Sequence, residues 1–254
     1  MSGYGFDLAG RHALITGGGS GLGLAIAQGL ARAGAHVVLN GRNRAKLDAA
    51  AAALRSQGGN VSLSAFDVTD AIAVACAIEA LERETPIDIL VNNAAVNQRA
   101  LLDDFSDVEW RALHAVNVDG VFFVTRAVIP GMKTRRRGKI INICSLASDL
   151  GRPSIVPYAT SKGALKMFTR ALAVELAPFD VQVNGIAPGF FKTEMNAPLV
   201  ANAEFSAWVE QRTPAGRWGE PSEVAGAAVF LASSAADYVT GHLLAVDGGF
   251  SAAY

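Results

Sequence analysis

Short apolar segments alternate with longer segments of helical periodicity along the whole chain. Apolar runs of strand length occupy residues 12–16, 36–40, 61–65, 87–91, 139–144, 181–186 and 243–246. Apolar residues recur at the spacing of one helix face over 22–33, 44–57, 72–83, 107–133, 158–177 and 222–232. Most of the strand segments are continuously apolar, as in strands covered on both faces. We therefore predict an α/β fold, a Rossmann-type doubly wound parallel sheet of about seven strands with helices on both faces.

No linker or internal repeat divides this pattern, so we expect a single domain over residues 1–254. The longest segment without a regular pattern, residues 188–203, follows the sixth predicted strand. Ligands of open α/β sheets bind beyond the carboxyl ends of the strands. We therefore expect a substrate loop or lid at about residues 188–215.

Composition and net charge exclude some classes of binding partner. The chain is 51% hydrophobic and 18% charged, which allows a sizeable core, and its net charge of -1 argues against nucleic acid or anionic membrane as partner. We interpret the basic run at residues 133–137 as a solvated helix end.

The two cysteines and four histidines show no metal-ligand spacing, which disfavours a zinc dehydrogenase. The sequence has neither a secretory signal pattern nor an apolar run of 18 residues, so we expect a cytoplasmic protein without a membrane span.

A glycine-rich turn joins the first predicted strand to the first predicted helix, with the spacing Gly17-x-x-x-Gly21-x-Gly23. Glycines permit a tight turn and a close approach of the backbone to a phosphate. The helix that follows offers unpaired N–H groups and the positive end of its dipole. At this place near the start of a βαβ unit, the motif predicts a dinucleotide-binding site.

Four polar residues suggest acid–base chemistry. Tyr158 and Lys162 are four positions apart near the start of a predicted helix, so both side chains lie on one face. A nearby ammonium favours the phenolate and lowers the pKa of a tyrosine. Ser145 closes the fifth predicted strand, 13 residues before Tyr158. Asn117 interrupts the long helical pattern, where an amide is unfavourable and often marks a local distortion.

These motifs resemble those of the short-chain dehydrogenase/reductase family. The glycine turn resembles its TGxxxGxG motif, and residues 92–95 resemble its NNAG motif with Ala95 in place of glycine. Residues 188–195 resemble its PG…TxM stretch, and the four polar residues resemble its catalytic tetrad. The resemblance runs from about residue 8 to the last predicted strand. It implies an NAD(P)-dependent oxidoreductase that interconverts a secondary alcohol and a ketone by hydride transfer.

The resemblance also implies roles for the tetrad. Tyr158 exchanges a proton with the reacting oxygen. Lys162 lowers the pKa of that tyrosine and binds the nicotinamide ribose. Ser145 hydrogen-bonds the substrate oxygen, and Asn117 positions a water that links the lysine to solvent. The family further implies a homotetramer built from the predicted helices around Asn117 and Tyr158 and from the region of the last strand.

Other residues match the family's cofactor contacts, together with Tyr158 and Lys162. They are Gly17, Gly19, Ser20, Gly21, Leu22, Gly23, Asn40, Arg42, Asp67, Val68, Asn93, Ala94, Pro188, Gly189, Thr193 and Met195. The second predicted strand ends in Asn40, which carries no charge to repel a 2′-phosphate, and Arg42 can bind that phosphate with its planar fork. Ser20 stands where NADP-dependent relatives often carry a second basic residue. We expect NADP(H) to be preferred and NAD(H) to be possible; the alternative for Arg42 is a solvated loop arginine.

Stretches outside the tetrad resemble the gluconate 5-dehydrogenase-like branch of the family, at residues 6–8, 40–42, 142–145, 148–152, 157–159, 189–195 and 212–219. That branch interconverts D-gluconate and 5-keto-D-gluconate. A sugar acid needs a cation for its carboxylate, and an arginine binds a carboxylate with two parallel hydrogen bonds. Arg152 is the first candidate, Arg99 the second, and Lys192 also follows a predicted strand end. We expect the substrate to contact Ser145, Arg152, Arg99, Tyr158 and Phe190.

Two alternatives remain open. The predicted lid is apolar at Phe190, Phe191, Met195 and Leu199, which favours a hydrophobic ketone or a 3-oxoacyl group as substrate. Trp208 lies near this segment and is a further candidate for substrate contact. A nucleotide-binding regulator without catalysis is the alternative of a different class. Loss of Tyr158 or Lys162 would favour it, and both residues are present.

Overall fold

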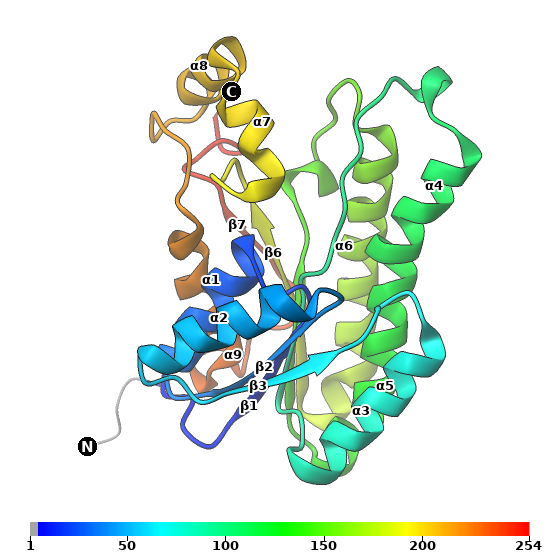
Figure 1. Cartoon of the computed structure of the whole chain (residues 1–254), viewed down its shortest axis with the longest axis vertical. Helices are drawn as coiled ribbons and strands as arrows, with labels where there is room; N and C mark the ends of the chain where they lie inside the picture. The colour runs from blue at the N-terminus through cyan, green and yellow to red at the C-terminus, as the bar shows by residue number, and fades with distance from the viewer. Residues whose placement is uncertain (1–4, 254) are drawn as a thin grey trace.

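A seven-stranded parallel sheet forms the centre of the computed structural model, which describes residues 5–253 (Figure 1). Its strands are β1 (His12–Ile15), β2 (His36–Gly41), β3 (Val61–Ala65), β4 (Ile89–Asn92), β5 (Gly138–Ile143), β6 (Val181–Pro188) and β7 (Leu243–Val246). Their order is β3-β2-β1-β4-β5-β6-β7, and every neighbouring pair is parallel. The strand order reverses between β1 and β4, where ligands bind in folds of this kind. The predicted fold class is confirmed.

Helices cover both faces of the sheet and produce two separate cores. On one face lie α1 (Gly21–Arg32), α2 (Arg44–Ser56) and α9 (Ala225–Ala232). On the other lie α3 (Ala71–Glu84), α5 (Gly120–Arg135) and α6 (Val156–Leu176). Along β1, Ala13 and Ile15 enter the first core and Leu14 enters the second. Because both faces are buried, the strands are apolar at successive positions.

The long helical pattern is interrupted as predicted. It forms α4 (Asp107–His114), a π-helical turn η2 (Ala115–Asp119) that contains Asn117, and then α5. Its start is fixed by a capping box between Ser106 and Glu109. By length and hydropathy, Asp107–Arg135 matches a membrane span. However, Val124, Val128 and Met132 of α5 are fully buried in the second core, so this helix is part of the folded interior.

The predicted lid contains helices that the sequence pattern did not reveal. After β6 come η5 (Glu194–Asn196), α7 (Ala197–Val200) and α8 (Ala203–Arg212), so the expectation of a segment without regular structure over 188–203 was wrong. The side chain of Asn202 caps α8 by accepting the N–H of Phe205 at 2.9 Å. In Figure 1, α7 and α8 lie at one end of the molecule, beyond β6. Shorter turns are η1 (Leu102–Asp104), η3 (Leu146–Ser148), η4 (Ala177–Phe179), η6 (Pro221–Val224) and η7 (Ser234–Ala236).

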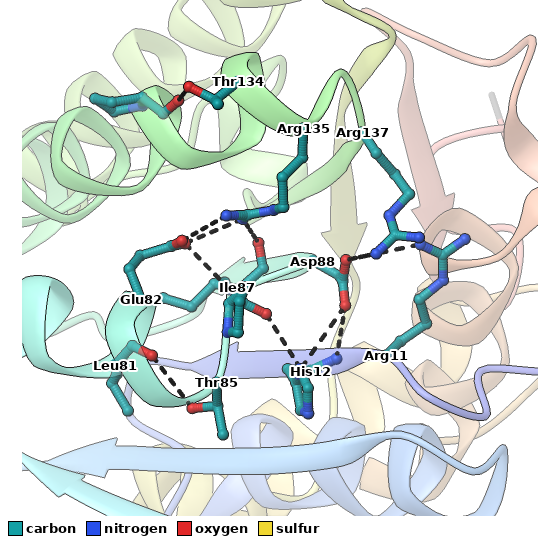
Figure 2. A network of polar contacts seen from close by, with 12 residues as sticks. Arg11, His12, Leu81, Glu82, Thr85, Ile87, Asp88, Thr134, Arg135 and Arg137 are labelled. Carbon is teal, nitrogen blue, oxygen red and sulfur yellow. Dashed lines mark hydrogen bonds and ion pairs between the residues drawn. The ribbon is translucent and has the colours of Figure 1, made fainter.

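The basic run at the end of α5 is exposed at Arg136 and Arg137, and two of its arginines also pair with carboxylates. Arg135 donates to both oxygens of Glu82, at 2.6 and 3.1 Å. Arg137 donates at 2.6 Å to the buried carboxylate of Asp88, which also accepts the backbone N–H of His12 at 3.1 Å. Figure 2 shows these contacts at the amino-terminal edge of the sheet. The helix end and its exposure were predicted correctly, but the ion pairs were not.

Candidate active site

The glycine turn is held between the ends of β1 and β4. Gly17 has a φ of +63°, and a Cβ on Gly23 would lie 2.4 Å from the Gly17 carbonyl oxygen, so the turn requires glycine at both places. The hydroxyl of Thr16 accepts the N–H groups of Asn93 at 2.9 Å and Ala94 at 3.1 Å. The Asn93 amide donates to the Thr16 carbonyl at 2.9 Å. The turn therefore has a fixed shape before any ligand binds.

The features of this turn fit a dinucleotide. Ser20 precedes α1, and its side chain makes no capping hydrogen bond to the helix. An uncapped helix N-terminus behind a glycine turn is a binding site for a diphosphate. Gly19 and Gly23, two of the predicted contacts, do not line the cavity, and a Cβ on Gly19 would lie 3.4 Å from Leu47 of α2. Their contact with a cofactor stays a prediction.

One cavity of about 660 Å³ runs along the carboxyl ends of the strands, from the glycine turn to the lid. Most residues predicted to contact cofactor or substrate line it. The exceptions are Gly19, Gly23, Asn117 and Lys192. Lys192 instead forms an ion pair with Glu220 at 2.7 Å. Tyr158, Ser145 and the glycine turn therefore share one continuous space.

Tyr158 and Lys162 lie on the cavity side of α6. The Lys162 side chain is only 3% exposed, and its Nζ donates to the carbonyl of Ile143 at 2.7 Å. That nitrogen lies 5.7 Å from the centre of the Tyr158 ring. Ser145 follows β5 directly, and its Oγ accepts the N–H of Ala147 at 3.1 Å, which leaves the hydroxyl proton to be donated elsewhere. A proton donor, a fixed cation and a second hydroxyl are thus brought together.

Asn117 is buried behind this group and does not reach the cavity. Its amide donates to the Val96 carbonyl and accepts the Val96 N–H, both at 2.9 Å. It also donates to Ser161 Oγ at 3.1 Å, and that hydroxyl donates to the carbonyl of Tyr158 at 2.7 Å. The π-helical turn thus directs an amide that joins the segment after β4 to the start of α6.

The cavity end near β2 has a cation at its rim. Asn40 is 1% exposed, and its amide donates to the carbonyls of Ser64 and Phe66 at 3.0 and 3.1 Å, which joins the ends of β2 and β3. Arg42 lies 3.6 Å from the Asp67 carboxylate. Burial opposes ionisation of Asp67, but hydrogen bonds from neighbouring groups and the Arg42 charge lower its pKa. The end of β2 itself carries no carboxylate.

The sequence analysis missed part of the opposite wall. Phe250 lines the cavity, with its ring centre 5.3 Å from that of Phe190; Trp208, already a candidate for substrate contact from the sequence, lines it beside Phe250. Arg212 also lines it and donates to the backbone carbonyls of Phe250 at 3.4 Å and Ala253 at 3.1 Å. Phe250 follows the last strand at its carboxyl end, so its place along the chain was an available signal. Arg212 had none, since it closes a helix that the pattern did not show.

Among the arginines in this part of the cavity, Arg212 donates only to backbone carbonyls of the described chain, and two others have neither a hydrogen-bond partner nor an anionic partner there. Arg99 and Arg152 both line it, and neither forms a hydrogen bond or ion pair with residues 5–253. Burial lowers the pKa of Arg152, and the positive charge of Arg99 lowers it further. Burial also lowers the pKa of Arg99, and Tyr158 opposes that shift. Adjacent like charges in a partly desolvated cavity are unfavourable until an anion binds.

Comparison with known proteins agrees with this geometry. A family model described as enoyl-(acyl carrier protein) reductase matches residues 17–251, and a short-chain type dehydrogenase/reductase from Mycobacterium marinum shares the fold at 34% identity, covering 98% of each chain, with a TM-score of 0.93. The chain belongs to the short-chain dehydrogenase/reductase family. It is therefore an NAD(P)-dependent oxidoreductase, as its sequence predicted.

Several relatives are similar to this chain over almost their whole length. The gluconate 5-dehydrogenase of Gluconobacter oxydans is 51% identical over 247 residues, which cover 97% of this chain and 96% of that protein. The 5-keto-D-gluconate 5-reductase of Escherichia coli K12 is 49% identical over 245 residues, 96% of each. A crystal structure of a gluconate 5-dehydrogenase from Burkholderia cenocepacia J2315, in complex with NADP and tartrate, has 50% identity, covers 98% of each chain and gives a TM-score of 0.95.

Proposed function

We propose that the chain interconverts 5-keto-D-gluconate and D-gluconate, with NADP(H) as the preferred cofactor and NAD(H) as a possible one. A single domain then binds the dinucleotide and carries the catalytic residues. The observation that supports an acidic substrate is the pair Arg99 and Arg152. Both lie in the cavity that also holds Tyr158, and neither is paired with a carboxylate of residues 5–253. A ketone without an anionic group gives these cations nothing to bind. The names of the full-length relatives support the same substrate.

The tetrad residues divide the acid–base work. The nicotinamide cofactor, when bound, supplies the hydride for reduction or accepts it in oxidation. Tyr158 gives a proton to the C5 oxygen of the substrate on reduction and takes it back on oxidation. Ser145 donates a hydrogen bond to the same oxygen. The Lys162 ammonium, which the Ile143 carbonyl holds beside Tyr158, contacts the ribose. Asn117 holds the start of α6 in place, as its hydrogen bonds indicate.

The substrate carboxylate pairs with Arg152, and Arg99 adds a second positive charge. Arg152 lies on the loop between β5 and α6, the two elements that supply Ser145 and Tyr158. The carboxylate of 5-keto-D-gluconate is four carbon–carbon bonds from the reacting carbon, so one ligand can reach the hydroxyl pair and the cations together. Phe190 contacts its carbon chain.

The experiment is a steady-state comparison of two ketones with NADPH and with NADH. One is 5-keto-D-gluconate, and the other is L-sorbose, which differs in having a CH2OH group in place of the carboxylate. We expect efficient reduction of the acid with NADPH and much weaker reduction of L-sorbose. Arg152→Gln should raise KM for the acid strongly, whereas Lys192→Gln, which removes a lid cation outside the cavity, should not.

A second candidate function is the reduction of hydrophobic ketones or 3-oxoacyl groups. It is favoured by the aromatic wall of Phe190, Trp208 and Phe250. Aryl ketones and a 3-oxoacyl thioester therefore belong in the same panel. If the protein reduces them well and ignores 5-keto-D-gluconate, the sugar-acid function is wrong and this one replaces it.

We also propose a cytoplasmic homotetramer, formed through the outer faces of α5 and α6 and the region of β7. Phe122, Met167 and Val174 expose apolar side chains on these two helices, which favours association. Small residues on α6 such as Ala171 permit close helix approach. Ala173 is buried in the core beneath α6 and makes no contribution. A monomeric mass by light scattering at micromolar concentration would contradict the proposal.

A further inference from the structure

Arg152 touches the lid through an aromatic ring. Its guanidinium carbon lies 5.1 Å from the centre of the Phe205 ring, close enough for a cation–π contact. Arg152 belongs to the loop between β5 and α6, whereas Phe205 belongs to the lid helix α8. The contact therefore joins the catalytic wall of the cavity to its lid.

The Phe205 ring is fixed by its neighbours. Its centre lies 5.9 Å from that of Phe190, 5.3 Å from that of Trp208 and 6.3 Å from that of Trp218. Trp218 is 2% exposed, and its indole N–H donates to Ser206 Oγ at 2.8 Å, which anchors α8 beside Phe205. The ring thus presents a defined surface to the arginine.

A guanidinium stacks through its face and forms hydrogen bonds through its edge. Arg152 lies over the Phe205 ring, and its N–H groups form no hydrogen bond with residues 5–253. A side chain that is already restrained loses less conformational entropy when it binds a ligand. The contact with the ring thus restrains Arg152 while its N–H groups remain available to an anion.

We propose that Phe205 is a positioning residue for substrate specificity: it holds Arg152 ready for the substrate carboxylate, so that the lid helix and the carboxylate site act as one unit. This inference rests on the proposed function, because it takes a carboxylate as the ligand of Arg152. It predicts that the lid favours acidic substrates although its surface is largely aromatic.

The test is a double-mutant cycle of Phe205→Leu and Arg152→Gln, with Phe205→Tyr as the variant that keeps the ring. Phe205→Leu should raise KM for 5-keto-D-gluconate about fivefold, within the roughly two- to thirtyfold range of a cation–π contact, and leave kcat unchanged. Phe205→Tyr should retain wild-type KM. In the Arg152→Gln background, Phe205→Leu should have no further effect, and KM for L-sorbose should not change.

A second readout keeps the test independent of turnover. Calorimetric titration of the NADP+-bound protein with tartrate measures binding of a hydroxy acid directly, and Phe205→Leu and Arg152→Gln should each weaken it. Arg152→Lys keeps the positive charge but lacks the planar guanidinium. It replaces Phe205→Leu in the test if that variant fails to fold, and it should likewise weaken tartrate binding. The inference is overturned if Phe205→Leu raises KM equally for both ketones, or if its effect on KM adds to that of Arg152→Gln. It is also overturned if tartrate binds the variants as tightly as the wild type. If the wild type ignores 5-keto-D-gluconate, the proposed function fails, and the tartrate titration alone decides for or against the role of Phe205.

Discussion

Replacement of Arg42 by alanine should separate the two nicotinamide cofactors. Arg42 lies at the cavity rim, 3.6 Å from Asp67, and 69% of its side chain is exposed. Exposed ion pairs of this kind contribute about 1 kcal/mol or less, so the arginine can exchange Asp67 for a phosphate at small cost. A hydrogen bond to a charged group contributes about 1.5–3 kcal/mol, or about 10- to 150-fold in affinity. Because this site is open to solvent, we expect a loss near the lower end, about tenfold, for NADPH and almost none for NADH.

Titration of each variant with NADPH and NADH, followed by nucleotide fluorescence, gives both dissociation constants. Arg44→Ala is the matched control, because Arg44 lies two residues further, pairs with Asp48 at 3.1 Å and does not line the cavity. Added salt should weaken NADPH binding to the wild type more than to Arg42→Ala. If Arg42→Ala weakens both cofactors equally, Arg42 does not contact the 2′-phosphate, and the preference for NADP(H) has another origin.

Three further predictions concern catalysis, stability and reactivity. Tyr158→Phe should lower kcat by at least about 10²-fold while NADPH affinity changes less than twofold, since only the proton carrier is lost; a variant with a third of the wild-type rate would refute the assignment. Asp88→Asn should lower the free energy of unfolding by about 1–2 kcal/mol in urea with kcat unchanged, because the buried side chain loses its charge-assisted hydrogen bond from the half-exposed Arg137. Burial raises the pKa of Cys144 to about 11, so below that pH its thiol stays protonated; iodoacetamide at pH 8 should modify exposed Cys76 alone, as peptide mass mapping will show.

The fold was predictable because its signal is repeated along the chain. Most strands are apolar on both faces, and the predicted ranges agree with the structure to within about two residues at most ends. Helix α8 escaped detection because only three apolar residues, Phe205, Trp208 and Val209, mark its inner side among polar neighbours. The pairing of Arg135 with Glu82 was also hidden, since the two residues are 53 positions apart.

The candidate site was predictable only where residues follow strand ends. Ser145, Asn93 and Gly189 each follow a parallel strand, so the topology alone directs them to one edge of the sheet. The bracing role of Asn117 could not be predicted, because it depends on contacts with Val96 that arise only in the folded chain. The contact of Arg152 with Phe205 depends in the same way on a loop and the lid helix α8 meeting across a cavity.

Arginines at the amino-terminal edge of the sheet are paired with carboxylates, whereas two at the carboxyl edge are not paired within the described chain. This difference indicates where the substrate binds. At the amino-terminal edge, Asp88 and Glu82 neutralise the arginines around them within the protein (Figure 2). At the carboxyl edge, Arg99 and Arg152 have no such partner among residues 5–253, although burial makes their charge unfavourable. A stable protein tolerates such a cost where a ligand removes it. The unneutralised pair is therefore better explained by an anionic substrate than by stability, and the aromatic lid that holds one member of it serves the same ligand.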